Sequence, residues 1–408
     1  YNEVSSYEGR PSKGAAMGLL ARAYLYRAGY SLHQNGKMER PEKYLDYYKK
    51  AKEVCAELIN SHRHKLNNSY ERVFKNVCEG IMDPSEVMYE VQFFNPSGEN
   101  DHSSKIGSYN SPEINRNSSF GLGNSFIKTS CFAYDLYEQG DARRETAIAT
   151  FKINAQDKFI EINRNESYNA PGKWRRNWIP GPPKDLENMD INFILLRYSD
   201  VLLMYAEAVT EAEGQLDNLG LECLNQVRRR AYGYNPTTAN SDIDFKMANF
   251  PSKESVEKYL FVERARELCF EGFRRFDLIR WNKLASTIKE FNDKFTAAVA
   301  DGTQRHAVPR AEAGRDSADH AGHRFRLRPR HHPVPRRLLH RDLHEAGDVR
   351  HHQHLRRERD EGLPDDDQDR TLGPVDGDLP HRDPGGGHRK LPCHPGREEK
   401  GAGPWIKK

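Results

Sequence analysis

The stretch RYSDVLLMYAEAVTEAEG (residues 197–214) predicts the fold of this chain, because its apolar residues recur at helical spacing. We expect this helix to begin upstream, near Asp190, and to carry one apolar flank: Ile194, Val201, Leu202, Tyr205, Ala208 and Val209. Gly214 ends the pattern, and NLGLECLNQVRRRAYG (residues 218–233) starts a return helix. Together these segments predict a helical hairpin of about 40 residues.

A second hairpin in the same style is predicted near the start of the chain. PSKGAAMGLLARAYLYRAGY (residues 11–30) has glycine or alanine at positions 14, 15, 18 and 21, which lets a neighbouring helix approach closely. PEKYLDYYKKAKEVCAELIN (residues 41–60) is amphipathic, with lysines and glutamates opposite an apolar stripe. The two hairpins resemble tetratricopeptide units. We therefore predict a mainly α fold of tetratricopeptide-like hairpins, with loop-rich insertions and a few short strands.

The helical signal weakens between residues 66 and 190. SEVMYEVQFF (residues 85–94) alternates apolar and polar side chains and predicts a strand. A polar loop follows over residues 95–124, then a short helix over 125–138 and another strand. A second loop, over residues 163–187, contains three prolines in IPGPPKD. Because long loops are uncommon inside a compact domain, these two segments are the expected location of a binding site.

VERARELCFEGFRRFDLIRW (residues 262–281) contains nine charged residues, among them Glu263, Glu267 and Glu271. A glycosidase needs two carboxyl groups that face each other across a sugar, about 5 to 9.5 Å apart. Glutamates spaced one turn apart on one helix point the same way instead. We therefore interpret these glutamates as members of a structural ion-pair network that ties helices together.

Local partners are expected for these charges. Arg264 can reach Glu267, and Glu271 can reach either of the two arginines that follow it, at helical spacings of three and four. Gly272 interrupts the pattern, which indicates a break between two helices or a close backbone contact.

Composition and motifs exclude several classes of function. The first 300 residues carry 41 basic and 41 acidic side chains, so they lack the basic surface typical of nucleic-acid binding. The six cysteines are scattered without a C-x-x-C pair, and His62 and His64 are interpreted as a solvated helix end. None of the nucleophile, zinc-protease, P-loop or dinucleotide motifs occurs in this part of the chain. We predict no enzyme activity, no cofactor and no metal site.

The helical motifs resemble the SusD/RagB family of Bacteroidetes outer-membrane nutrient-binding lipoproteins. The resemblance rests on RYSDVLLMYAEAVTEAEG with LECLNQVRRRA, followed by ERARELCFEGFRRFDLIRW. It covers about residues 10 to 297 and includes three upstream motifs: KGAAMGLLARAYLYRAG, SEVMYEVQF and LYEQGDARRETAI.

This resemblance implies a cell-surface protein of the outer membrane that captures oligosaccharides. Family members cover a SusC-like TonB-dependent transporter and deliver the ligand for import, and they have no catalytic residues. In the RagB branch the ligand is a peptide, which remains an alternative. A tetratricopeptide-like scaffold for protein partners is a further alternative, although the two long insertions disfavour a regular array.

Candidate ligand contacts come from the chemistry of sugars rather than from the family motifs. A sugar ring has an apolar C–H face and a rim of hydroxyls, so its site needs exposed aromatic planes beside amide or guanidinium groups. The loops offer seven such residues: Phe94, Tyr109, Tyr168, Trp174, Arg175, Asn177 and Trp178. Trp174 and Trp178 are the preferred pair. The alternative is that these aromatic residues anchor their own loops onto the helical core.

The chain departs from the family at both ends. Residues 1–297 are predicted to form the SusD/RagB-like domain without its N-terminal part, so that the signal peptide and the lipid-bearing cysteine are absent. Residues 298–408 hold most of the histidines, and from residue 301 onward there is no Tyr, Asn or Met. This tail is interpreted either as a disordered, His-rich extension or as the product of a reading-frame slip. The abrupt change in composition favours the slip, and we expect no folded function from the tail.

Overall fold

The computed structural model describes residues 10–94, 103–163, 169–183 and 185–302. Its contacts divide the chain into two units, Tyr1–Ala318 and Asp319–Lys408, and all the described residues belong to the first unit. The predicted boundary at residue 297 and the two interpretations of the tail remain predictions, because residues 303–408 lie outside the described residues. The described part is mainly helical with a few short strands, which confirms the predicted fold class.

The first predicted hairpin is formed by α1 (Lys13–Ala28) and α2 (Tyr44–Asn60), which pack against each other. Ser12 caps α1, and its hydroxyl accepts a hydrogen bond from the backbone N–H of Ala15 at 3.0 Å. Gly18 is buried, and a Cβ atom at this position would lie 2.5 Å from the side chain of Leu196. The small residues of α1 therefore allow the close approach that the sequence predicts.

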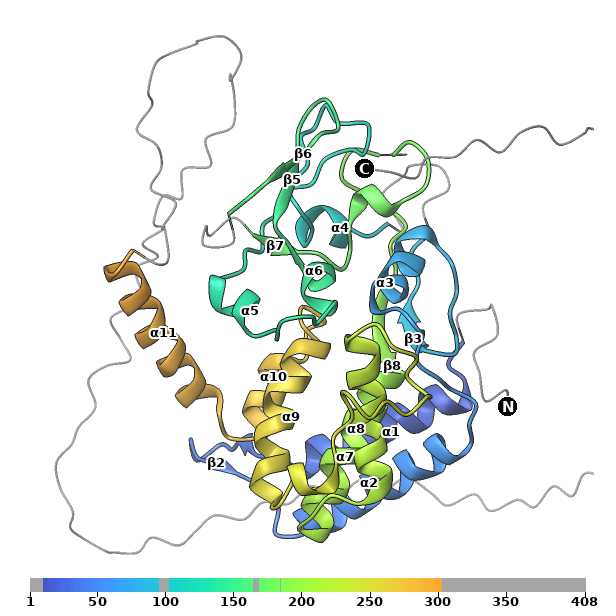
Figure 1. Cartoon of the computed structure of the whole chain (residues 1–408), viewed down its shortest axis with the longest axis vertical. Helices are drawn as coiled ribbons and strands as arrows, with labels where there is room; N and C mark the ends of the chain where they lie inside the picture. Colours follow the sequence, from blue (N-terminus) through green and yellow to red (C-terminus); the bar gives the residue numbers. More distant parts are fainter. Residues whose placement is uncertain (1–9, 95–102, 164–168, 184, 303–408) are drawn as a thin grey trace, which may run out of the picture. The chain divides into compact units, whose positions relative to one another are not determined.

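The second hairpin consists of α7 (Tyr198–Glu213) and α8 (Asn218–Ala231). Gly214 ends α7 with a φ of +77°, a conformation that glycine adopts without strain. α7 lies beside α2, α8 and α9 (Lys253–Glu267), as Figure 1 shows. Because it has neighbours on several sides, residues 198–210 are all buried, and the helix is buried well beyond the single flank that its sequence predicts.

The start predicted for this helix is wrong. Phe193–Arg197 form the strand β8, which pairs antiparallel with β3 (Val87–Val91). β3 confirms the strand predicted within residues 85–94 and supplies the partner that residues 193–197 need. An isolated apolar run fits either a helix or a buried strand, and the pairing partner decides between them.

The remaining strands are two or three residues long and pair antiparallel. They are β1 (Ser31–Leu32) with β2 (Met38–Glu39), β4 (Ile148–Ala149) with β7 (Ala170–Pro171), and β5 (Phe151–Ile153) with β6 (Phe159–Glu161). The last two pairs lie in the segment between β3 and β8, which we call the insertion. It also contains the short helices α4 (Ile106–Tyr109), α5 (Cys131–Asp135) and α6 (Arg143–Ala147) and the 3₁₀ turn η2 (Arg176–Trp178). The sequence predicts a helix over residues 125–138, but α5 is shorter than that.

The charged stretch at residues 262–281 forms two helices. α9 ends at Glu267 and α10 (Arg274–Arg280) begins after Gly272, whose φ of +88° places it in a left-handed turn. No side chain or backbone atom lies within 4 Å of a Cβ added at Gly272, so the glycine marks a break rather than a close contact. α11 (Leu284–Ala300) follows, and two further helical elements complete the described part: α3 (Tyr70–Glu79) and the 3₁₀ turn η3 (Met247–Asn249).

Glu267 lies at the centre of a buried ion-pair network. Its carboxylate accepts hydrogen bonds from Arg143, Arg197 and Arg230, and all four side chains are at most 2% exposed. Burial alone would raise the pKa of Glu267, but the three guanidinium groups hold it well below its usual range. Because the arginines come from α6, the end of β8 and α8, this one carboxylate joins α9 to three other elements.

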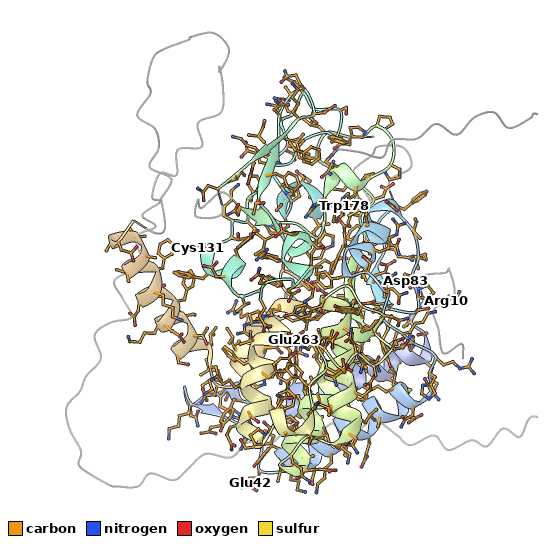
Figure 2. The ribbon with its side chains drawn as sticks, viewed as in Figure 1. Arg10, Glu42, Asp83, Cys131, Trp178 and Glu263 are labelled. Atoms are coloured by element: carbon orange, nitrogen blue, oxygen red, sulfur yellow. The ribbon has the colours of Figure 1, made fainter. Side chains whose placement is uncertain are left out.

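The two flanking glutamates are engaged in the same way. Glu263 accepts from Arg143 at 2.6 Å, and Figure 2 labels it on α9. Glu271 accepts from Lys173 at 2.6 Å and from Arg197 at 2.8 Å. All three glutamates are at most 1% exposed, so none of them faces a solvent-filled site where it could act as an acid or a base. The structural interpretation of these charges is confirmed.

The local ion pairs predicted for this stretch are wrong. Arg264 binds Asp200 at 2.7 Å and Asp277 at 2.9 Å instead of Glu267. The partners of Glu271 come from the insertion and from β8 rather than from the arginines that follow it. Helical spacing identifies which charges are neighbours on a lone helix, but buried charges bind across elements, where desolvation makes a close partner necessary.

Candidate functional site

The segment around η2 is where most of the predicted ligand contacts lie. The turn is closed by the backbone N–H of Trp178, which donates to the carbonyl of Arg175 at 3.0 Å. The segment follows β7, whose pairing with β4 fixes its start. It therefore places Trp174, Arg175, Asn177 and Trp178 next to one another on a short, defined piece of backbone.

Trp174 does not offer a surface to a ligand. Its side chain is 0% exposed and belongs to a hydrophobic cluster with residues of α3 and β8. The ring lies 6.0 Å from that of Phe193 in a stacked arrangement and 6.2 Å from that of Phe74, edge to face. Trp174 therefore anchors the insertion to the core instead of contacting a ligand, which was the alternative given for the loop aromatic residues. The expectation of an exposed tryptophan pair is not met.

Trp178 is half-buried at the surface of the same segment, and Figure 2 labels it in the insertion. The guanidinium carbon of Arg175 lies 4.5 Å from the centre of its ring, and the ammonium of Lys75 lies 5.9 Å away. Arg175 is itself held by a hydrogen bond to the carbonyl of Gly172 at 2.8 Å, and burial lowers the pKa of its guanidinium to about 10. Trp178 is thus a positioned aromatic plane with a cation beside it.

Three side chains close to Trp178 in the sequence have a buried polar atom without a hydrogen-bond partner. Within the described ranges these are Nη1 of Arg176, Oδ1 of Asn177 and Nε1 of Trp174. Burial of unmatched polar atoms is costly, and most such atoms in folded proteins are paired. Arg176 is only 2% exposed, yet its guanidinium binds just two backbone carbonyls, those of Phe120 and Asp185. Their concentration here indicates a segment arranged for something other than stability alone.

A small cleft opens beside this turn. It has a volume of about 70 Å³ and is lined by Phe120, Arg176 and residues 179–183 and 188–190. Gly121, with a φ of +86°, permits the guanidinium of Arg176 to lie against the backbone, since a Cβ there would be 2.5 Å from its Nε. The cleft combines proline and aromatic walls with a cationic donor, a lining that suits one edge of a polar ring.

The other predicted contacts lie in two further places. Tyr109, on α4, is half-buried, and its ring centre is 4.8 Å from that of Phe126. α4 packs close to the η2 segment, because a Cβ at Gly107 would be 3.2 Å from the carbonyl oxygen of Trp174. Phe94 is 65% exposed just beyond β3. Tyr168 lies outside the described residues.

Sequence reasoning missed two aromatic residues of this face. Phe126 is 64% exposed and pairs with Tyr109, while Phe120 lines the cleft. Both occur in SSFGLGNSF (residues 118–126), a polar, glycine-rich run whose two phenylalanines are the available signal. Among the described residues, no group of histidine, cysteine or acidic side chains has the geometry to hold a metal ion.

Comparison with known proteins identifies the family. The profile of the SusD family matches residues 126–329, which is half of the chain and includes the η2 segment. The chain belongs to the SusD family. The match continues past residue 297, into the region that the sequence assigns to the tail.

Individual relatives of this SusD-family chain are distant. The SusD-like protein P25 of Formosa agariphila is 24% identical over 270 residues, which are 59% of this chain and 47% of that protein. A crystal structure of a SusD homologue from Bacteroides thetaiotaomicron is 27% identical, with a TM-score of 0.60 over 70% of this chain and 57% of that one. A structure with a xylogluco-oligosaccharide is 22% identical, with a TM-score of 0.52 over 70% of this chain and 55% of that one. The chain therefore spans about half the length of the relatives it matches.

Proposed function

We propose that this SusD-family chain captures oligosaccharides through the insertion, on the face formed by η2 and its cleft. The observation that carries the proposal is the half-buried Trp178, placed beside Arg175 and next to side chains with unmatched polar atoms. The aromatic plane suits the C–H face of a sugar ring, and the amide and guanidinium groups suit its hydroxyls. Trp178, Arg175, Asn177 and the Tyr109–Phe126 pair are the proposed contacts, and Phe94 and Tyr168 remain candidates from the sequence alone.

Two further considerations support an oligosaccharide as the ligand. A solved structure of this fold contains a xylogluco-oligosaccharide, so the fold is compatible with such a ligand in that protein. The three glutamates at α9 and α10 that could suggest hydrolysis are bound by arginine and lysine side chains in the interior. The protein is therefore proposed to bind its ligand and release it unchanged.

The cellular setting is proposed from family membership. We place the protein at the cell surface, held in the outer membrane by an N-terminal lipid and covering a SusC-like TonB-dependent transporter. In the part of the chain that the structure describes, no helix combines the length and hydropathy needed to cross a bilayer. Co-purification of the tagged full-length protein with a SusC-like transporter from outer membranes tests this partnership, and recovery of the protein without any transporter argues against it.

The ligand class is tested by affinity electrophoresis and calorimetry. The purified chain is compared on a panel of neutral and acidic polysaccharides and on a set of mixed peptides. We expect retardation by at least one polysaccharide and no heat of binding with the peptides. Binding to peptides with no response across the polysaccharide panel would contradict the proposal and favour the RagB-like alternative.

A further inference from the structure

A second and larger cavity lies among the helical hairpins. It has a volume of about 380 Å³, within the range of about 300 to 1,000 Å³ that is typical of small-molecule sites. Its walls come from α2, α7, α9 and the end of α10, and none of its lining residues belongs to the insertion. The oligosaccharide proposal gives this cavity no role.

Carboxylates dominate the end of the cavity between α7 and α9. Glu207 and Glu211 lie one turn apart on α7, and Glu257 faces them from α9. Glu207 is fully engaged, since it accepts from Arg280 at 2.8 Å and from Trp281 at 2.8 Å. Glu211 and Glu257 share a single ammonium, that of Lys253, at 2.7 Å and 3.5 Å. One positive charge therefore serves two carboxylates.

Burial and neighbouring carboxylates shift the pKa of two groups that line the cavity. Burial and the neighbouring Glu207 and Glu257 raise the pKa of Glu211 to about 7, even though Lys253 opposes the shift. Burial and the carboxylates of Glu207 and Glu211 also raise the pKa of Tyr48. The Tyr48 side chain is 2% exposed and lines the cavity, and its hydroxyl has no hydrogen-bond partner among the described residues.

Two aromatic rings also line the cavity, one of them beside Glu207. The ring centres of Phe261 and Trp281 are 5.8 Å apart, and both side chains line the cavity. Four cationic side chains also line the cavity: Arg40, Lys258, Arg280 and Lys283. Arg280 binds Glu207 and Asp277, and the guanidinium of Arg40 lies 3.5 Å over the ring of Tyr44. Carboxylates and aromatic faces in one cavity are features that hold organic cations.

We propose that this interhelical cavity binds an organic ammonium group, with Glu211 and Glu257 facing the cation, the hydroxyl of Tyr48 directed at it and the rings of Phe261 and Trp281 against its apolar body. This site is independent of oligosaccharide capture, so its failure would leave that proposal untouched.

Calorimetry with choline tests the proposal, because a quaternary ammonium keeps its charge at every pH. The whole chain is titrated with choline and with its uncharged isostere 3,3-dimethylbutan-1-ol. We expect choline to bind at least tenfold more tightly than the isostere. Glu211→Gln and the more exposed Glu257→Gln should each weaken choline binding about tenfold, while Glu213→Gln, an exposed acid paired with Lys52 outside the cavity, should leave it unchanged.

Choline affinity should also fall as the pH is lowered from about 8 to about 6, because protonation of Glu211 removes a charge. The groups nearest Glu211 are Glu207 on α7, Lys253 and Glu257 on α9, and Tyr48 on α2. The other charged groups of the cavity lining are Arg40, Glu254, Lys258, Arg280 and Lys283. Equal binding of choline and its isostere would overturn the proposal, as would unchanged affinity in both glutamine variants or no heat with choline at about 10 mM. A thermal melt of each variant confirms that it is folded.

Discussion

Polar side chains are buried at the helices α9 and α10 and also at the turn η2, but the hydrogen bonding of these side chains differs between the two regions. At α9 and α10, the carboxylates of Glu263, Glu267 and Glu271 all accept hydrogen bonds from buried cations. At η2, polar atoms of Arg176, Asn177 and Trp174 are left without partners among the described residues.

This difference separates two uses of polar burial. A network in which every carboxylate is matched fixes how helices meet, and removing one member leaves an uncompensated charge. An unmatched buried group costs free energy instead of stabilising the fold, so such a group is a candidate for a role other than stability. The comparison predicts that substitutions in the first region change the free energy of unfolding, whereas those in the second change binding.

The largest effect is expected from Glu267→Gln. This change leaves three buried guanidinium groups without their shared anion, so the free energy of unfolding should fall by about 3–5 kcal/mol. Urea unfolding followed by circular dichroism measures it. Glu290→Gln, in an exposed pair with Lys294, is the matched control and should change stability by less than about 0.5 kcal/mol. A small effect at Glu267 would mean that the network is not the tie between these elements.

Trp174→Ala should also be destabilising, by about 3 kcal/mol, because it empties a closed aromatic cluster. Trp178→Ala should cost less than about 1 kcal/mol, since its ring is only half-buried. Thermal unfolding of the two variants side by side makes the measurement. Equal melting temperatures would contradict the division of roles between these tryptophans.

An intermediate effect is expected at Glu211, whose carboxylate is buried without full compensation. Because its pKa is raised to about 7 in the folded protein, the native state holds the proton at pH values where the unfolded chain has lost it. This carboxyl group therefore lowers stability as the pH rises from about 4.5 to about 7. Glu211→Gln should be more stable than the parent at pH 8, on the order of 1 kcal/mol, and should lose this advantage near pH 4.5. Urea unfolding at both pH values checks the sign, and a gain that is larger at pH 4.5 would contradict it.

The smallest change in stability is expected for Asn177→Ala. The Oδ1 atom of this side chain has no partner in the described part, so its loss should change the free energy of unfolding by less than about 0.5 kcal/mol. The same variant should weaken oligosaccharide binding several-fold. Urea unfolding measures the stability of the variant, and calorimetry on the same preparation measures its affinity for the oligosaccharide. A large loss of stability with unchanged binding would contradict the assignment of Asn177 to ligand binding.

Much of the helical framework could be predicted from the sequence, because hairpins such as α1–α2 have local signals. Small residues on α1, the cap at Ser12 and the break at Gly214 each act within a turn or two of their own position. β8 could not be separated from the helix after it, since its strand conformation depends on pairing with β3 about 100 residues earlier. The partners of Arg264 and Glu271 were missed for the same reason.

The candidate site was predicted less well, because exposure is a property of packing rather than of residue type. Trp174 and Trp178 have similar neighbours in the sequence, yet α3 and β8 enclose the first and leave the second at the surface. Phe126 joins Tyr109 only because the loop between them folds back on itself, with the N–H of Phe126 donating to the carbonyl of Tyr109 at 2.9 Å.

The most direct test of the oligosaccharide proposal is the affinity of Trp178→Ala for the best polysaccharide from the panel, measured by calorimetry beside Phe276→Ala. Phe276 is 54% exposed on α10 and serves as an aromatic control outside the insertion. We predict that Trp178→Ala loses at least tenfold in affinity, about 1.4 kcal/mol, with its fold intact, while Phe276→Ala binds like the parent. Unchanged affinity in Trp178→Ala, or an equal loss in both variants, would contradict the assignment of the ligand to the η2 face.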